Sequence, residues 1–132
     1  MNPFDDMEIA RESFAYRDLL GADQWDEFTV STNASSVGAL TAEGRYRIEG
    51  RKCDFQALLS AATTVATVAR VTFINLPTSA GGLAGFGVMM NDTVNEAVGL
   101  CSISVSSSRC YLPTQNATSD VLKVYGSFEI GG

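Results

Sequence analysis

The stretch GRYRIEGRKCDFQALL, residues 44–59, contains the pattern that decides the fold. It reads as one strand, a tight break at Gly50 and a second strand. In the second strand, apolar residues stand at every other position, namely Cys53, Phe55, Ala57 and Leu59. A period of two with one apolar face is typical of a β-strand that buries one side and exposes the other. The sequence therefore predicts a half-buried β-hairpin.

From residue 28 onward the chain continues as strands and turns, without a helical period. Strand-like runs are FTVSTN (28–33), TTVATVARVTFINLP (63–77), FGVMMN (86–91), EAVGLCSISVSSS (96–108), RCYLP (109–113) and VLKVYGSFEI (121–130), and SSVGALTAEG (35–44) is a Gly- and Ser-rich connection with strand character. Loops or turns are predicted at 78–85, 91–95 and 114–120. Short strands at this spacing are typical of sandwiches and barrels. We therefore expect an all-β, jelly-roll-like β-sandwich of about eight strands. Its predicted buried residues are Phe55, Phe73, Val88, Ile103, Val124 and Phe128.

Charge divides the chain into an acidic leader and a neutral body. Residues 1–27 hold eight Asp and Glu residues against two Arg residues, which gives −6, the net charge of the whole chain. Residues 28–132 hold seven acids and seven bases. We therefore predict an N-terminal anchoring arm over 1–27 and a β-sandwich domain over 28–132. Neither part offers a basic face to phosphates, so nucleic acid is not an expected partner.

The leader combines its carboxylates with large apolar side chains. Asn2 is a good N-cap, Pro3 suits the first helical position and Gly21 would end a helix, so the arm can be a short acidic helix. It can also be an extended arm that inserts side chains into a partner, or it can pack against its own body. For a partner-binding arm, the predicted contact residues are Phe4, Met7, Ile9, Phe14, Tyr16, Leu20 and Trp25.

The residues that most catalytic and metal sites require are scarce. The chain has no His, which removes Ser-His-Asp and Cys-His arrangements and most zinc sites. The glycine-dense stretch SAGGLAGFG (79–87) lacks the Lys and the helix of a phosphate-binding loop. We expect no catalytic residue, no metal site and no cofactor, and hence a protein that is not an enzyme. No run of 18 apolar residues is present, so no membrane span is expected.

The three cysteines, Cys53, Cys101 and Cys110, are an odd number in a chain whose acidic N-terminus lacks the features of a secretory signal. Free thiols made in a reducing cytosol are therefore the default expectation. Cys101 and Cys110 could nevertheless face each other across a hairpin and form a disulfide.

The runs GRYRIEGRKCDFQALL, VARVTFINLPTSAG (68–81) and VLKVYGSFEI together resemble the small β-sandwich domains of tailed-bacteriophage structural proteins. In those domains a G-x-Y strand, a Gly turn and an alternating strand precede a strand that ends in a Leu-Pro turn. The matching positions here are Gly44, Tyr46, Gly50, Phe55, Leu76 and Pro77, and the resemblance covers residues 38–130.

This resemblance implies a virion structural protein that forms a jelly-roll homotrimer. Spike and fibre domains usually end a longer chain with a shaft, whereas a short β-domain behind an arm is more similar to a capsid decoration or cement protein. The implied partner is the major capsid protein, at the outer surface of the capsid, after synthesis in the host cytoplasm. Two alternatives stay open: a tail spike, fibre or adaptor module that binds host-surface glycan, and a non-viral lectin-like or cytokine-like domain.

Overall fold

The computed structural model describes residues 25–130, apart from the side chains of residues 82–84. These residues form strands and no helix: β3 (Asp26–Phe28), β4 (Ser35–Val37), β5 (Leu40–Glu49), β6 (Lys52–Ala61), β7 (Thr64–Thr67), β8 (Phe73–Asn75), β9 (Ala80–Asn91), β10 (Glu96–Ser104), β11 (Arg109–Tyr111), β12 (Gln115–Thr118) and β13 (Leu122–Ile130). The predicted all-β class is confirmed, with eleven strands in this range rather than about eight.

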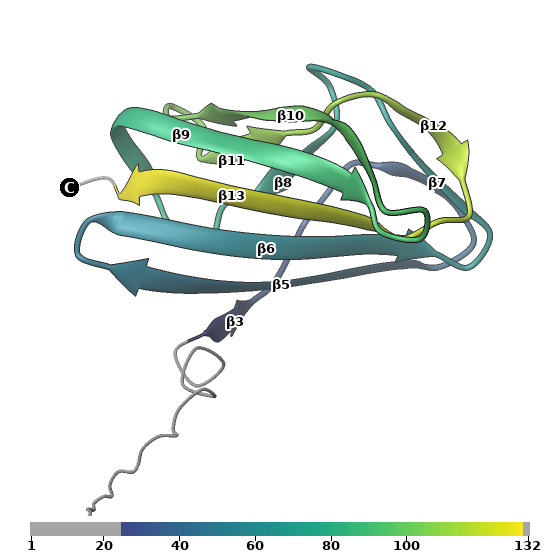
Figure 1. Ribbon diagram of the computed structural model, residues 1–132, viewed down its shortest axis with the longest axis horizontal. Helices are drawn as coiled ribbons and strands as arrows, with labels where there is room; N and C mark the ends of the chain where they lie inside the picture. The colour runs from purple at the N-terminus through teal and green to yellow at the C-terminus, as the bar shows by residue number, and fades with distance from the viewer. Residues whose placement is uncertain (1–24, 131–132) are drawn as a thin grey trace, which may run out of the picture.

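One large antiparallel sheet carries most of the fold. Its eight strands lie in the order β3-β5-β6-β13-β9-β10-β11-β8, and a small sheet has the order β12-β7-β4. The large sheet curls into a half-barrel, with β7 and β12 near one end (Figure 1). The sheet therefore has an inner face, which holds the core, and an outer face, which the core does not cover.

The predicted hairpin is confirmed as β5 and β6. Glu49 pairs with Lys52 across the two-residue turn. Gly50 has a φ of +62° there, and Gly is favoured at the first turn position of a type II′ hairpin because it tolerates positive φ. The four alternating residues from Cys53 to Leu59 are all buried, so the period of two identified the inner face correctly.

Two glycines on the inner face make room for a large aromatic ring. Phe55 of β6 pairs with Gly126 of β13, which pairs with Gly87 of β9, which pairs with Cys101 of β10. A Cβ atom at Gly126 would lie only 2.3 Å from Cζ of Phe55. The Phe55 ring therefore lies over Gly126, and its centroid is 5.9 Å from that of Phe128. Both phenylalanines are almost completely buried, as predicted.

The orientation predicted for β9 was wrong. Val88 was predicted to be buried, and alternation would place Phe86 and Met90 on the same face, but Met89 is fully buried and Phe86 is 69% exposed. The reason is that the inner positions before Met89 are glycines. Gly85 lies against Ile103, and Gly87 lies against Cys101, so the buried positions carry no hydrophobic signal in the sequence. Val88 is half-buried on the outer face, while Val124 is buried as expected.

Three other predicted boundaries were also wrong. The run 63–77 is not one strand, because a turn at residues 69–71, where Arg70 has a φ of +69°, separates β7 from β8. The Thr72 hydroxyl accepts a hydrogen bond from the Val68 amide at 2.8 Å and stabilises this turn. Most of the predicted loop at 78–85 belongs to β9, and the predicted turn at 114–120 contains β12. Phe73 and Ile103 are half-buried rather than buried.

The prediction of a strand over 28–33 was wrong as well, because β3 ends at Phe28 and the segment after it crosses from one edge of the large sheet to the other. β3 pairs with β5, and the chain then runs along β8. The Asn75 amide donates to the Ser31 carbonyl at 3.2 Å, and the Phe73 amide donates to Oδ1 of Asn33 at 2.9 Å. The β8 edge is thus covered, which limits its pairing with other chains.

Candidate interaction surface

The outer face of the large sheet is formed by the side chains that alternate with the core. One row runs from Arg45 on β5 through Gln56 on β6, Tyr125 on β13 and Val88 on β9 to Leu100 on β10. Each pair in this row is a direct cross-strand pair, so the side chains are neighbours on one surface. The row is polar at its β5 end and apolar at its β10 end.

The apolar end widens into what we call the outer patch, which consists of Phe86, Val88, Met90, Leu100 and Tyr125. Leu100 is 81% exposed and Phe86 is 69% exposed, and the other three are half-buried. Single exposed apolar residues are common on proteins, whereas a contiguous group of them is often a contact surface. The packing of the core does not bury the outer patch, so a contact with another surface is the natural explanation for these exposed apolar residues.

Two hollows lie beside the outer patch. One, of about 510 Å³, lies next to Phe86 and is lined by Arg51, Lys52, Asp54, Gly85, Phe86, Ser127, Phe128 and Glu129. The other, of about 670 Å³, lies toward β3 and β5, and its lining includes Arg45, Gln56, Leu58 and Lys123. Charged and polar residues make up more than half of the residues that line each hollow.

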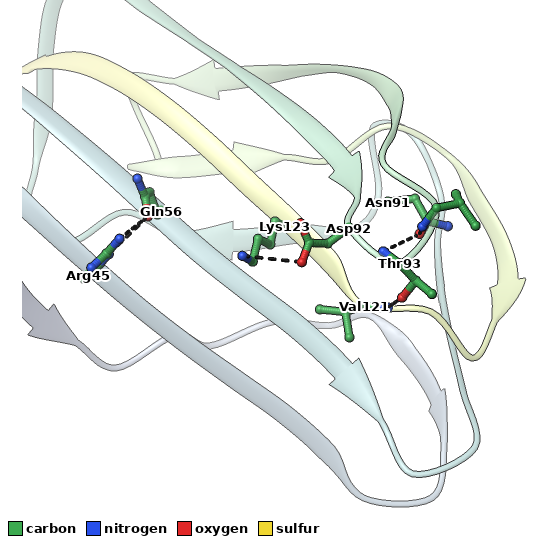
Figure 2. Close-up of polar contacts among 8 residues, drawn as sticks. Arg45, Gln56, Asn91, Asp92, Thr93, Val121 and Lys123 are labelled. Atoms are coloured by element: carbon green, nitrogen blue, oxygen red, sulfur yellow. Dashed lines mark hydrogen bonds and ion pairs between the residues drawn. The ribbon is translucent and has the colours of Figure 1, made fainter.

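Charged residues border the outer patch toward β5 and β6 and at the β9–β10 turn, and most of them are paired. Lys123 lies 3.4 Å from Asp92, and Arg47 lies 3.5 Å from Asp54. Arg45 donates from Nε and Nη2 to Oε1 of Gln56 at 3.1 and 3.0 Å, an amide partner that leaves its charge uncompensated at that contact. Figure 2 shows the Arg45 and Lys123 contacts on the same side of the sheet.

The turn between β9 and β10 is held rigidly below the outer patch. Oδ1 of the buried Asn91 accepts hydrogen bonds from the amides of Thr93 and Val94 at 3.1 and 3.3 Å. The Thr93 hydroxyl in turn accepts from the Val121 amide at 3.0 Å (Figure 2). These contacts fix the position of Asp92, the partner of Lys123, and so fix one side of the surface.

Among the contact residues predicted for the arm, Trp25 is the one that lies within the described residues. Its ring lies under the guanidinium groups of Arg45 and Arg47, which are 5.0 and 5.1 Å from the ring centroid, in cation–π contacts. The leader therefore joins the body on the outer face. The other predicted contact residues, Phe4, Met7, Ile9, Phe14, Tyr16 and Leu20, and the predicted helix lie outside the described residues. Asp26 and Glu27, which we assigned to the arm, are part of β3.

Sequence reasoning missed both of the most exposed residues of the outer patch. Leu100 could have been found, because the alternation that directs the predicted core residue Ile103 inward directs Leu100 outward. Phe86 could not, because the glycines of β9 gave that strand the opposite apparent orientation.

The three cysteines are free thiols and are buried. Burial, together with the neighbouring charge of Asp54, raises the pKa of Cys53 to about 11. A side-chain hydrogen bond with Cys101, and then burial, raise the pKa of Cys110 well above its usual range. Cys110 pairs with Ile103 rather than with Cys101, so the two thiols are diagonal neighbours on the hairpin. Neutral buried thiols are poor nucleophiles.

Two further properties bear on function within the described part of the chain. Residues 25–130 contain no cluster of three or more Cys, Asp or Glu residues that could hold a metal ion. No helix suited to crossing a membrane occurs among the same residues.

Comparison of the chain with protein families, curated proteins and solved structures found no match.

Proposed function

We propose that this chain is a structural protein of a tailed-bacteriophage particle, a capsid decoration or cement protein that acts through protein–protein contacts. The outer patch carries this proposal. It exposes Phe86 and Leu100 on a rigid sheet face, at a place where neither side chain contributes to the core. A rigid apolar surface with a polar rim is the arrangement that protein interfaces use.

The assignment to a phage particle rests on the resemblance of residues 38–130 to the small β-sandwich domains of tailed-bacteriophage structural proteins. In this proposal the partner is the major capsid protein, the protein lies on the outer surface of the capsid, and it functions as a homotrimer without catalytic activity or cofactor. A relationship to jelly-roll domains is part of the same proposal. Docking would add buried interface between capsid subunits and so oppose the internal pressure of the packaged genome.

The leader gives the proposal a second contact element. Its apolar residues, which include Phe4, Phe14 and Leu20, would insert into the partner while its carboxylates meet a basic surface. Burial of four such side chains contributes on the order of 6–12 kcal/mol before ordering costs, which cancel much of it. Three arms of a trimer would act together.

The direct test is binding of the purified protein to undecorated phage heads. We expect binding in many copies per particle, and we expect Phe86→Ser with Leu100→Ser to reduce it strongly. The matched control is Val37→Ser with Val71→Ser, which removes two apolar side chains that are 57% and 58% exposed elsewhere on the body. Equal binding by all three proteins would contradict the role of the outer patch.

Copy number and oligomeric state complete the test. Copies confined to a single vertex would favour a tail adaptor over a head decoration protein. Sedimentation of the isolated protein as a monomer, both alone and after release from particles, would contradict the trimer.

A further inference from the structure

We propose that residues 14–20 of the chain's own leader, FAYRDLL, lie on the outer patch in the isolated protein. The leader would cover the apolar surface until a partner takes its place. This inference rests on the proposed function in one respect, which is that the same patch serves for docking. It names the occupant of that patch before docking.

The size of the outer patch favours a short segment over a second copy. Two exposed and three half-buried side chains offer on the order of 300–500 Å² of apolar surface. A stable pair of folded proteins usually buries about 800 Å² on each partner. A segment of seven residues with four large apolar side chains, Phe14, Tyr16, Leu19 and Leu20, matches the smaller area.

The leader joins the body on the outer face of the large sheet, which is the face that carries the outer patch. Trp25 contacts Arg45 and Arg47 on the outer face. From β3 to β9 there are four strand steps in the sheet order, which is about 19 Å at a strand spacing of about 4.8 Å. Leu20 lies five residue steps before Trp25 and can be at most about 17 Å from it, whereas Phe14 lies eleven steps before Trp25 and can be about 36 Å away. Leu20 can therefore reach β13, three strand steps away, and Phe14 can reach β9 without full extension.

The chemistry of the two surfaces is complementary. Asp18 and Asp23 flank the leucine pair of the leader. Arg45 is hydrogen-bonded to the amide of Gln56 and makes no ion pair within 4.0 Å among residues 25–130, although Glu27 stands opposite it on β3. A leader that crosses β5 and β6 brings its carboxylates past this guanidinium and its apolar residues onto β13 and β9. Because the segment is tethered, its effective concentration is in the millimolar range, so even a weak contact would be occupied.

The first experiment is covalent footprinting of the full-length chain by hydroxyl radicals with mass spectrometry. We compare the wild type with a leader variant, Phe14→Ser, Leu19→Ser and Leu20→Ser. The expected result is stronger labelling of Phe86, Met90 and Tyr125 in the variant, with Phe73 and Tyr111 labelled equally in both. Equal labelling of the outer patch in both proteins would overturn the proposal.

The second experiment uses trypsin on the full-length chain, because Arg17 lies inside the proposed segment and Arg11 lies before it. Cleavage after Arg11 is the internal reference. Proteolysis tracks the population of the open form, so a segment that is about four-fifths docked is cut about fivefold more slowly. We expect Phe86→Ser with Leu100→Ser to restore cleavage after Arg17, and the control Val37→Ser with Val71→Ser to leave it slow.

Repeating the experiments at several protein concentrations distinguishes whether the leader or a second copy of the chain occupies the outer patch. Protection by the leader of the same chain is independent of protein concentration, whereas protection by a second copy increases with it. Protection that rises with concentration and survives the leader substitutions would overturn the proposal in favour of self-association. Failure of these tests leaves docking on particles unaffected, and failure of docking leaves these results unaffected.

Discussion

Replacement of Gly126 by Ala tests the packing at the centre of the inner face. The added Cβ would lie 2.3 Å from Cζ and 2.4 Å from Cε1 of Phe55, and contacts below 3.0 Å require a neighbour to move. The Phe55 ring is 1% exposed and packs against Phe128, so it has little space to move into. Overpacking typically costs about 1–3 kcal/mol, and we expect the upper part of that range for Gly126→Ala.

A double-mutant cycle shows whether the ring causes this loss. Phe55→Leu removes the two ring atoms nearest the new methyl group and by itself costs about 1–2 kcal/mol of lost apolar contact. In that background Gly126→Ala should cost under about 1 kcal/mol, because only the Phe86 carbonyl oxygen remains close. The expected coupling is about 2 kcal/mol, within the range seen for contacting residues.

The measurement is urea unfolding of the full-length chain, followed by far-UV circular dichroism. Gly50→Ala is the matched control, because its Cβ would meet no atom within 4 Å and its cost comes from the positive φ alone. That cost, about 1–2 kcal/mol, should be the same with Phe55 or Leu at position 55. A Gly126→Ala penalty that is equally large in both backgrounds would refute the packing argument.

The remaining predictions concern the core and its thiols. Phe128→Ala should lower the free energy of unfolding by about 3–5 kcal/mol in the same urea assay. Since burial raises the pKa of Cys53 from 9.0 to about 11, the folded state holds this proton more tightly than the unfolded state. The corresponding stability is complete below about pH 9 and is lost between about pH 9 and 11, by up to roughly 3 kcal/mol, and Cys53→Ala should flatten that part of the pH profile. At pH 8 a thiol reagent should label Cys101 and Cys110 only at the rate of unfolding, and rapid labelling of either residue would contradict their burial.

Much of the large sheet could be predicted from the sequence where side-chain polarity alternates. β6 carries Cys53, Phe55, Ala57 and Leu59 inward, and β13 carries Val124 and Phe128 inward, as expected, together with Leu122. In these strands the inner residues are apolar and most outer ones are polar, so a period of two reveals the face. The turn at Gly50 was also predictable, because a hairpin of this type selects glycine.

The candidate surface could be predicted only in part, because its position depends on contacts between distant strands. The division into an acidic leader and a neutral body gave a reason to expect a contact protein, but it pointed to the leader alone. The cation–π contacts of Trp25 require β3 to pair with β5. A strand of only three residues has too short a pattern for this pairing to be predicted from the sequence. The turn at Arg70 depends on the Thr72 hydroxyl, and a β-branched run conceals it.

The outer patch follows from the way the core is packed, and this explains why apolar residues lie on the outer face of β9. A shift of β9 by one residue would bury Phe86, Val88 and Met90. The shifted strand would then place large side chains where Gly85 and Gly87 now lie against Ile103 and Cys101, with contacts of 2.9 and 3.1 Å even for a single added carbon. The inner face has no space for them, because Phe55 already lies over the adjacent Gly126. The sheet therefore keeps Phe86 and Val88 on the outer face, and the apolar surface that results is one that the core does not cover.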